Sequence, residues 1–415
     1  MTDLFSITFA LLFAFIAGEV ARKLKFPRFI GQLCFSLFLA IPFFQDTLFG
    51  PEASHTIETF STLGIVFLMF LTGLEMNVEE FKKGKWDAAC IAFTAALAPF
   101  CFGVLLARFF GMSWTTGVVL GACLSVTAEG TTVIVLNELR KTKTYLASII
   151  IGAGILDDIF EIFFLLFVLG MRHSDSIEQG NSLFLLPIKL VLFIVVSIVA
   201  FRFFPWIMKR IQRSHNEVTL FHGMLVIGLL SAMFSEWMGV GAIIGAFLAG
   251  IILQKSFNSV SRKEREENAL HLFLFSFIIP FFFIFIGLHF EYQILFQNPL
   301  LTLSVVAVAF LGKILGILAA KPFVSLQWRQ LYLVGWGMNS RGVMELVIAY
   351  IALTGGLISQ ELYSAIVFMT IVTTVTFPFV FRSIVRKYPN IMENSHPEGF
   401  IEKYAPRIVA GGKSR

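Results

Sequence analysis

Long apolar runs recur along the whole chain and constrain its fold more than any other feature. The chain has 415 residues, of which 57% are hydrophobic and only 14% charged, whereas soluble domains carry about 25% charged residues. Apolar runs of about 20 residues have the length of a membrane-spanning helix, which satisfies its own backbone hydrogen bonds in lipid. We therefore predict an all-α polytopic membrane protein with thirteen spans. The predicted spans cover residues 4–21, 29–44, 60–76, 88–110, 114–139, 145–170, 183–204, 217–236, 240–254, 270–288, 300–320, 329–352 and 362–381.

The basic residues between these spans predict the orientation of the chain in the membrane. Lys and Arg concentrate in the loops that follow odd-numbered spans, as in Arg22, Lys23 and Lys25. Because cytoplasmic loops carry an excess of Lys and Arg, we predict an external N-terminus and a cytoplasmic C-terminus. The same dispersal of positive charge over short loops argues against a nucleic-acid partner. No removable signal peptide is expected, because no basic segment precedes the first span.

Two short motifs occur twice along the chain. Gly73 in FLMFLTGLEMN and Gly287 in FFFIFIGLHFEY lie 214 residues apart, while Glu129 and Arg341, each followed by Gly, lie 212 residues apart. Seven predicted spans, an odd number, separate the members of each pair, so the two copies would have opposite orientations in the membrane. Such inverted repeats are a common construction of secondary transporters.

These features predict the domain organisation. We expect a transmembrane domain at 1–381, with inverted repeats at about 1–170 and 217–381 and a linker helix at about 183–204, followed by a short basic cytoplasmic tail at 382–415. The four cysteines have no paired spacing and the seven histidines form no ligand cluster, so neither a disulfide framework nor a resident metal site is expected. We expect no cofactor and no enzymatic activity.

Three acidic residues interrupt the sixth predicted span, in the segment GILDDIFEI. A charge near the middle of a bilayer costs at least ~2.5 kcal/mol on insertion scales, so such residues usually face a bundle interior or a wet cavity. Asp157 and Asp158 are adjacent, and Glu161 follows one helical turn later. Together they predict an acidic wall that binds a cation, although a single intramembrane acid can also serve only as a hydrogen-bonding residue between helices.

Two predicted spans carry polar and glycine residues at mid-depth, SVTAEGTT from Ser125 and GMNSRGVMEL from Gly337. This composition is expected where a helix unwinds and its backbone faces a cavity. If the two broken helices cross, Glu129 and Arg341 can offset the partial charges of the exposed helix ends. Alternatively, Arg341 and Glu345 neutralise each other at i, i+4; the two interpretations are compatible.

Lys313 lies near the centre of the eleventh predicted span, in FLGKILGIL. A buried ammonium group is costly without a partner, and the intramembrane acids are the obvious candidates. If Lys313 pairs with one residue of the Asp157 and Asp158 couple, the other carboxylate is free to alternate between a proton and a metal cation.

These residues together resemble the Kef/Nap-type branch of the monovalent cation:proton antiporter superfamily, along essentially the whole chain. The family's motifs appear in its order. They are Phe26-Pro27 with Gly31, GLEMN (73–77), Asp157-Asp158, GAFLAG (245–250), Lys313 and GMNSRG (337–342).

The resemblance implies thirteen helices, a panel or dimerisation domain, and a core domain with two crossed broken helices that moves as an elevator. It implies that Asp158 carries the ion and the proton, and that Asp157 forms an ion pair with Lys313. Members with this pair and lysine are typically electrogenic sodium/proton antiporters. The family's hydroxyl and backbone ligands correspond to the region of Ser125 and Thr127.

The chain departs from the family pattern at several positions. Glu129 stands where many members have a small or neutral residue, Glu161 adds an acid beside the pair, and Asn339-Ser340 replaces a frequent proline. The resemblance therefore supplies no role for Glu129 or Glu161.

The sequence thus predicts an antiporter that exchanges a monovalent cation, Na⁺ first and K⁺ or Li⁺ as alternatives, for H⁺. Asp157 and Asp158 would hold the transported cation, and Lys313, Thr127, Ser125 and Glu129 would complete the ion- and proton-binding site, with Glu161, Arg341 and Glu345 as accessory residues. We expect a homodimer in lipid, in a bacterial inner membrane. A sodium-coupled symporter of an organic solute and a channel or non-transporting sensor are the alternative functions.

Overall fold

The computed structural model describes residues 3–41, 51–75, 86–172, 217–238, 241–254, 257 and 260–392. The predicted seventh span and linker helix, and the tail from residue 393 onward, lie outside these residues. Helix α19 ends at Lys387, so it continues beyond the predicted end of the last span at residue 381.

Every regular element within the described residues is helical, which confirms the predicted all-α fold class. Eight helices in these ranges are long and apolar enough to cross a membrane. Each predicted span other than the seventh coincides with one helix or with consecutive helices. The helices are α1 (Asp3–Lys23), α2 (Arg28–Leu39), α4 (Pro51–Glu75), α6 (Trp86–Phe109), α7 (Trp114–Ser125), α8 (Glu129–Glu138), α9 (Tyr145–Arg172), α11 (Glu217–Trp237), α12 (Ala242–Gln254), α13 (Val260–Phe273), α14 (Ile279–Leu288), α15 (Tyr292–Gln297), α16 (Pro299–Ala319), α17 (Trp328–Gly337), α18 (Val343–Thr354) and α19 (Gln360–Lys387).

Local sequence signals explain several helix boundaries. Ser113 and Ser359 cap the N-termini of α7 and α19, where their side chains accept hydrogen bonds from the backbone N–H groups of Thr116 and Leu362. Such capping satisfies N–H groups that have no partner inside the helix. Pro299 stands in the first turn of α16, where a missing N–H costs nothing.

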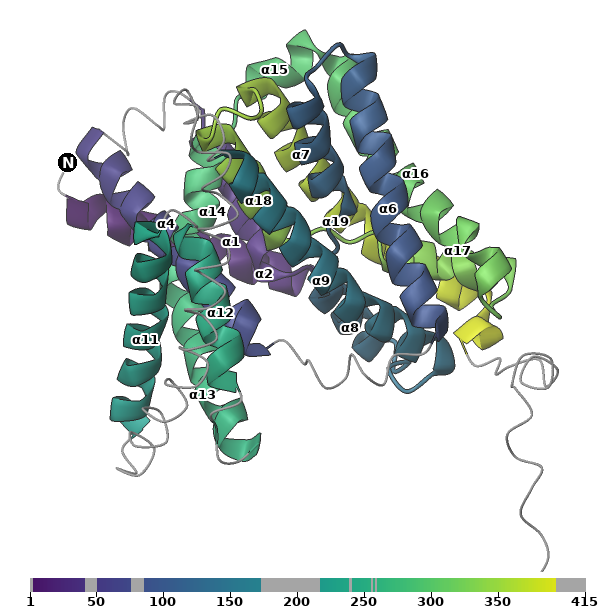
Figure 1. The fold of residues 1–415 in the computed structure, drawn as a ribbon, viewed down its shortest axis with the longest axis horizontal. Helices are drawn as coiled ribbons and strands as arrows, with labels where there is room; N and C mark the ends of the chain where they lie inside the picture. Colours follow the sequence, from purple (N-terminus) through teal and green to yellow (C-terminus); the bar gives the residue numbers. More distant parts are fainter. Residues whose placement is uncertain are drawn as a thin grey trace, which may run out of the picture.

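The described helices form two bundles that lie side by side (Figure 1). One bundle contains α1, α2, α4 and α11 to α14, and the other contains α6 to α9 and α16 to α19. The helices of each bundle come from both halves of the sequence. Neither half could therefore fold into its final packing alone.

Glycines allow the closest helix crossings in the first bundle. A Cβ atom at Gly73 of α4 would lie 2.1 Å from the carbonyl oxygen of Phe247 on α12, and one at Gly287 of α14 would lie 2.1 Å from Oγ of Ser36 on α2. Small residues let helix backbones approach in this way. In the predicted repeat, each span of the first half corresponds to the span seven places later. Span three (α4) therefore corresponds to span ten (α14), and span two (α2) corresponds to span nine (α12), so the two crossings occupy corresponding positions.

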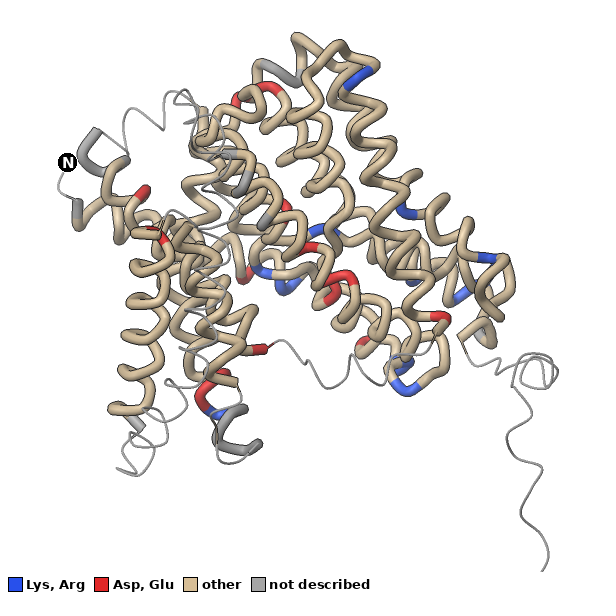
Figure 2. Tube along the Cα trace, in the orientation of Figure 1, with Lys and Arg blue, Asp and Glu red and all other residues tan. Residues whose placement is uncertain are grey.

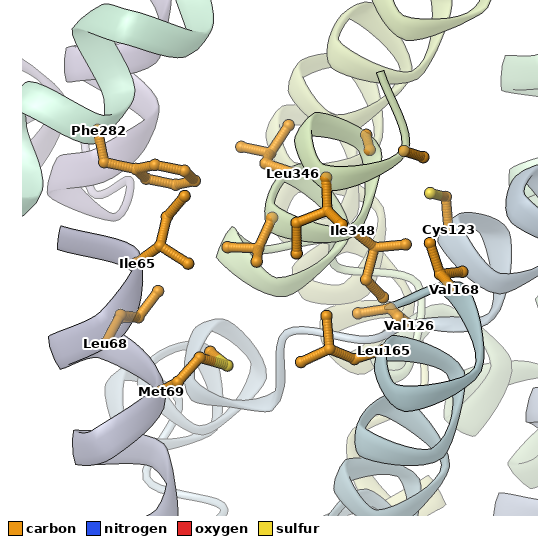
Figure 3. Close-up of a cluster of buried hydrophobic side chains, with 14 of the residues drawn as sticks. Ile65, Leu68, Met69, Cys123, Val126, Leu165, Val168, Phe282, Leu346 and Ile348 are labelled. Atoms are coloured by element: carbon orange, nitrogen blue, oxygen red, sulfur yellow. The ribbon is translucent and has the colours of Figure 1, made fainter. Parts of the chain in front are cut away.

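The two bundles meet across an apolar interface (Figure 3). Side chains of α4 and α14 face side chains of α18 and α9 in one continuous core cluster. Among the labelled residues, the first bundle contributes Ile65, Leu68, Met69 and Phe282, and the second contributes Leu346, Ile348, Leu165, Val168, Cys123 and Val126. An interface of this composition depends on dispersion and close packing, which are not directional.

Both predicted helix breaks are present, and both lie in the second bundle. Helix α7 ends at Ser125 and α8 begins at Glu129, while α17 ends at Gly337 and α18 begins at Val343. The backbone of the intervening residues is not helical. These breaks position the polar residues described next.

Candidate ion-binding site

The two breaks cross and bond to each other through their backbones. The N–H of Ala128 donates to the carbonyl oxygen of Ser340 at 2.9 Å, and Oγ of Ser340 donates to the carbonyl oxygen of Ala128 at 2.5 Å. Gly342 permits this approach, because a Cβ atom there would lie 2.6 Å from Cβ of Ala128. Oγ1 of Thr132 on α8 also donates to the carbonyl oxygen of Gly337, at 2.5 Å. The crossing is therefore a hydrogen-bonded unit.

Arg341 supplies positive charge to the end of α7. Its Nη1 atom donates to the carbonyl oxygens of Val126 and Cys123, which lie at the end of α7 and carry the negative partial charge of that helix. Its Nε atom lies 3.9 Å from Oε2 of Glu345, and both side chains are fully buried. Arg341 thus takes part in both interactions considered from the sequence.

Two threonines of α19 complete this network, and sequence reasoning missed them. Oγ1 of Thr374 donates to the carbonyl oxygen of Arg341 at 3.0 Å and accepts from its N–H. Oγ1 of Thr370 donates to Oε1 of Glu345. The sequence feature that could have identified these threonines is the segment TIVTTVTF, because hydroxyl residues four positions apart lie on the same side of an apolar helix.

Lys313 of α16 and Asp157 of α9 form a buried ion pair. Nζ of Lys313 lies 3.2 Å from Oδ2 of Asp157, and the two side chains are 0% and 1% exposed. Oδ1 of Asp157 has no hydrogen-bond partner in the described part of the chain. Asp158, the next residue, is partly buried and forms no ion pair within the described residues. One acid of the couple is thus neutralised and the other is not.

Glu161 connects α9 to the first break. Its Oε1 atom accepts a hydrogen bond from the backbone N–H of Thr127 at 2.8 Å. Oγ1 of Thr127 is buried without a hydrogen-bond partner among the described residues, so it is available as a neutral oxygen ligand. Glu161 therefore positions the break and places Thr127 beside its own carboxylate.

Ser125, at the end of α7, is hydrogen-bonded to the backbone through its side chain. Its Oγ atom lies 2.7 Å from the carbonyl oxygen of Ala96 on α6 and 2.9 Å from that of Gly121. The hydroxyl proton therefore goes to backbone carbonyls, and the side chain joins α7 to α6. Glu129, in contrast, lies in the first turn of α8 with its carboxylate against Gly154 of α9.

Acidic and basic positions come together inside the second bundle (Figure 2). Most other charged positions lie towards the ends of helices, so this internal group is distinctive. It combines carboxylates, one ammonium group and a threonine hydroxyl beside unwound backbone. Oxygen ligands of this kind suit a hard cation.

The family assignment follows from the sequence as a whole. The family described as sodium/hydrogen exchanger, transmembrane, matches residues 9–387. The chain belongs to the sodium/hydrogen exchanger family. Membership confirms the resemblance predicted from the motifs and agrees with an integral membrane protein.

Curated relatives of this exchanger share about a quarter of its residues over nearly its full length. The chain is 27% identical to the Na⁺/H⁺-K⁺ antiporter GerN of Bacillus cereus, over 90% of this chain and 94% of the relative. It is 28% identical to a Na⁺/H⁺ antiporter of Enterococcus hirae, over 90% of this chain and 95% of the relative.

The fold also matches a solved exchanger structure. The sodium proton antiporter MjNhaP1 of Methanocaldococcus jannaschii superposes with a TM-score of 0.63 over 92% of this chain and 96% of its own, at 15% sequence identity. This match confirms the predicted sodium/proton antiporter fold.

Proposed function

We propose that this chain is a secondary active antiporter that exchanges a monovalent cation for H⁺, with Na⁺ preferred and K⁺ or Li⁺ as further substrates. Its family and its antiporter relatives support the reaction class. The relatives include proteins named for sodium exchange and proteins named for potassium exchange, so the cation has to be established for this chain by experiment.

One observation carries the assignment of the carrier. Asp157 has its countercharge in Lys313 at 3.2 Å, whereas the adjacent Asp158 lacks an ion-pair partner within the described residues. An unpaired carboxylate in a partly dry site is costly, and either a proton or a metal cation removes that cost. Asp158 would therefore bind the two ions in competition, which is the coupling that an antiporter needs.

The apolar interface between the bundles supports an elevator movement. The second bundle holds the candidate site, and its apolar side chains, such as Leu346, face those of the first bundle, such as Ile65, within one core cluster. Packing that is not directional can be replaced by similar packing after a shift. In this proposal the second bundle moves against the first and exposes Asp158 to each side of the membrane in turn.

The proposal includes the membrane placement. The N-terminus would lie outside and the C-terminus in the cytoplasm of a bacterial inner membrane. Two copies would associate through the first bundle, whose α1 helix carries exposed apolar side chains at Leu4, Leu12 and Phe15. Exposed apolar surface of this kind suits either lipid or a second copy.

Replacement of Asp158 tests the function. Purified wild type and Asp158→Asn would be reconstituted in proteoliposomes with a clamped membrane potential and a pH-sensitive dye, and Na⁺, K⁺ and Li⁺ would be added in turn. We expect cation-dependent proton movement in the wild type and none in Asp158→Asn, because an amide cannot exchange a proton for a cation.

Glu58→Gln is the matched control, because it neutralises an exposed acid of α4 and should retain wild-type exchange. Wild-type rates in Asp158→Asn would refute the carrier assignment. Cation flux without proton coupling in the wild type would favour a channel, and proton coupling that required an organic solute would favour a symporter.

A further inference from the structure

Glu129 is a half-buried acid of the second bundle, which the sequence assigns to the ion-binding site but to which the carrier mechanism proposed above gives no specific contact. It is the first residue of α8, immediately after the break. Its Oε1 atom is buried without a hydrogen-bond partner among the described residues. A carboxylate in this position is stabilised by the positive partial charge at the N-terminus of α8. That interaction alone leaves the buried Oε1 atom without a hydrogen bond.

The Glu129 carboxylate occupies a space that exists only because residue 154 is glycine. A Cβ atom at Gly154 would lie 1.7 Å from Cδ, 1.8 Å from Oε1 and 2.1 Å from Oε2 of Glu129. Any side chain at this position of α9 would therefore displace the carboxylate. The contact between the first turn of α8 and the glycine of α9 is thus specific to this pair of residues.

Gly154 places Glu129 next to the paired acids. It lies three and four residues before Asp157 and Asp158, which is one turn along the same side of α9. The Glu129 carboxylate accordingly experiences electrostatic repulsion from Asp158, Asp157 and Glu161. Glu129 on α8 thus lies close to the acids of α9.

The nearby positive charges are committed to other partners. Lys313 pairs with Asp157 at 3.2 Å, and Arg341 lies 3.9 Å from Glu345 and donates to the carbonyls at the end of α7. Glu129 and Asp158 form no ion pair within the described residues. A bound cation would supply the charge that these two carboxylates lack.

We propose that Glu129 is a further cation-binding residue of the transport site, held against α9 by the absence of a side chain at Gly154. The cation would be bound between Asp158 on α9 and Glu129 on α8, with the unpartnered hydroxyl of Thr127 beside them. This inference rests on the proposed antiporter function. It makes α8 and α9 jointly responsible for the affinity for the cation.

Two single variants test the inference in proteoliposomes. Glu129→Gln keeps the shape of the side chain and removes its charge, while Gly154→Ala keeps the charge and displaces it. We expect each to raise the KM for the cation about ten- to hundredfold, the equivalent of one lost charge-assisted contact. Gly154→Ala should fold normally, because the clashing atoms are the mobile end of a side chain.

Gly152→Ala is the matched control on the same helix. A Cβ atom there meets only Cβ of Ala88, at 3.5 Å, which is an ordinary contact, so its KM should equal that of the wild type. The double variant Glu129→Gln/Gly154→Ala should have the KM of Glu129→Gln alone, because both changes remove the same interaction.

The outcomes separate this inference from the proposed function. If the wild type exchanges cations for protons and Asp158→Asn does not, but Glu129→Gln and Gly154→Ala leave the KM unchanged, Glu129 is not a cation ligand. If Glu129→Gln fails to fold, Gly154→Ala decides alone. Exchange that survives in Asp158→Asn refutes the function itself.

Discussion

At the scale of single residues, the most consequential feature is the placement of opposite charges away from solvent. Lys313 and Asp157 are 0% and 1% exposed at a separation of 3.2 Å. A buried ion pair contributes little net stability against an apolar alternative, but removal of one partner leaves an uncompensated charge that costs about 3–5 kcal/mol. The loss of either charge from this pair should therefore carry a large energetic penalty.

Lys313→Met should lower the free energy of unfolding by about 3–5 kcal/mol, since it leaves the Asp157 carboxylate buried without its countercharge. The double variant Lys313→Met/Asp157→Asn should recover most of that loss, because neither charge remains. Thermal unfolding of the purified protein in detergent measures both. Equal melting temperatures for Lys313→Met and the wild type would contradict a structural contribution of the pair.

At the scale of elements, the two breaks and the glycine crossings decide how closely helices approach. The break residues were predictable because Gly, hydroxyl residues and one charge interrupt apolar spans at mid-depth. Their partners were not, since the bond between Ala128 and Ser340 joins residues more than two hundred positions apart. The contact of Ser125 with the backbone of α6 was likewise not predictable, because it has no sequence signal.

Gly73→Ala should destabilise the packing of α4 on α12, because its Cβ would lie 2.1 Å from the carbonyl oxygen of Phe247. Backbone atoms cannot move aside cheaply, and overpacking typically costs about 1–3 kcal/mol. Gly64→Ala on the same helix is the control, because its nearest contacts would be 3.5 to 3.6 Å. The melting temperature and folded yield should fall for Gly73→Ala only; equal values for the two variants would argue against the close crossing.

At the scale of the whole molecule, the packing of two bundles across an apolar interface determines which movements are possible. All the residues proposed to bind the cation belong to the second bundle, so a movement of that bundle carries the site as a unit. The interface offers side chains of α4 and α18 that face each other (Figure 3). An elevator movement must change the contacts between them.

A cross-link across this interface should stop transport. Ile65→Cys and Leu346→Cys would be introduced together in a background from which the four native cysteines have been replaced, and joined with a reducible bifunctional reagent. We expect exchange to cease after cross-linking and to return after reduction, because the link prevents one bundle from moving against the other. Each single cysteine variant, treated identically, should remain active; full activity of the linked protein would rule out relative movement at this interface.

The sequence alone was sufficient to predict the fold class, the two breaks, the repeat offset and the acids and lysine at mid-depth. These features can be recognised in the sequence because each charge and each unpaired backbone group in lipid has a free-energy cost of its own. That cost does not depend on which distant residues the group contacts. The positions of Asp157, Asp158 and Lys313 in apolar runs were therefore sufficient to predict them as functional candidates.

Only the tertiary structure decided which of these residues meet. It brought Lys313 to Asp157, Glu161 to the backbone of Thr127, Thr370 and Thr374 to the second break, and Glu129 to Gly154. The physical reason is that such contacts depend on crossing geometry between helices distant in sequence, and that geometry is set by close packing of many side chains and by glycines whose neighbours the sequence does not specify.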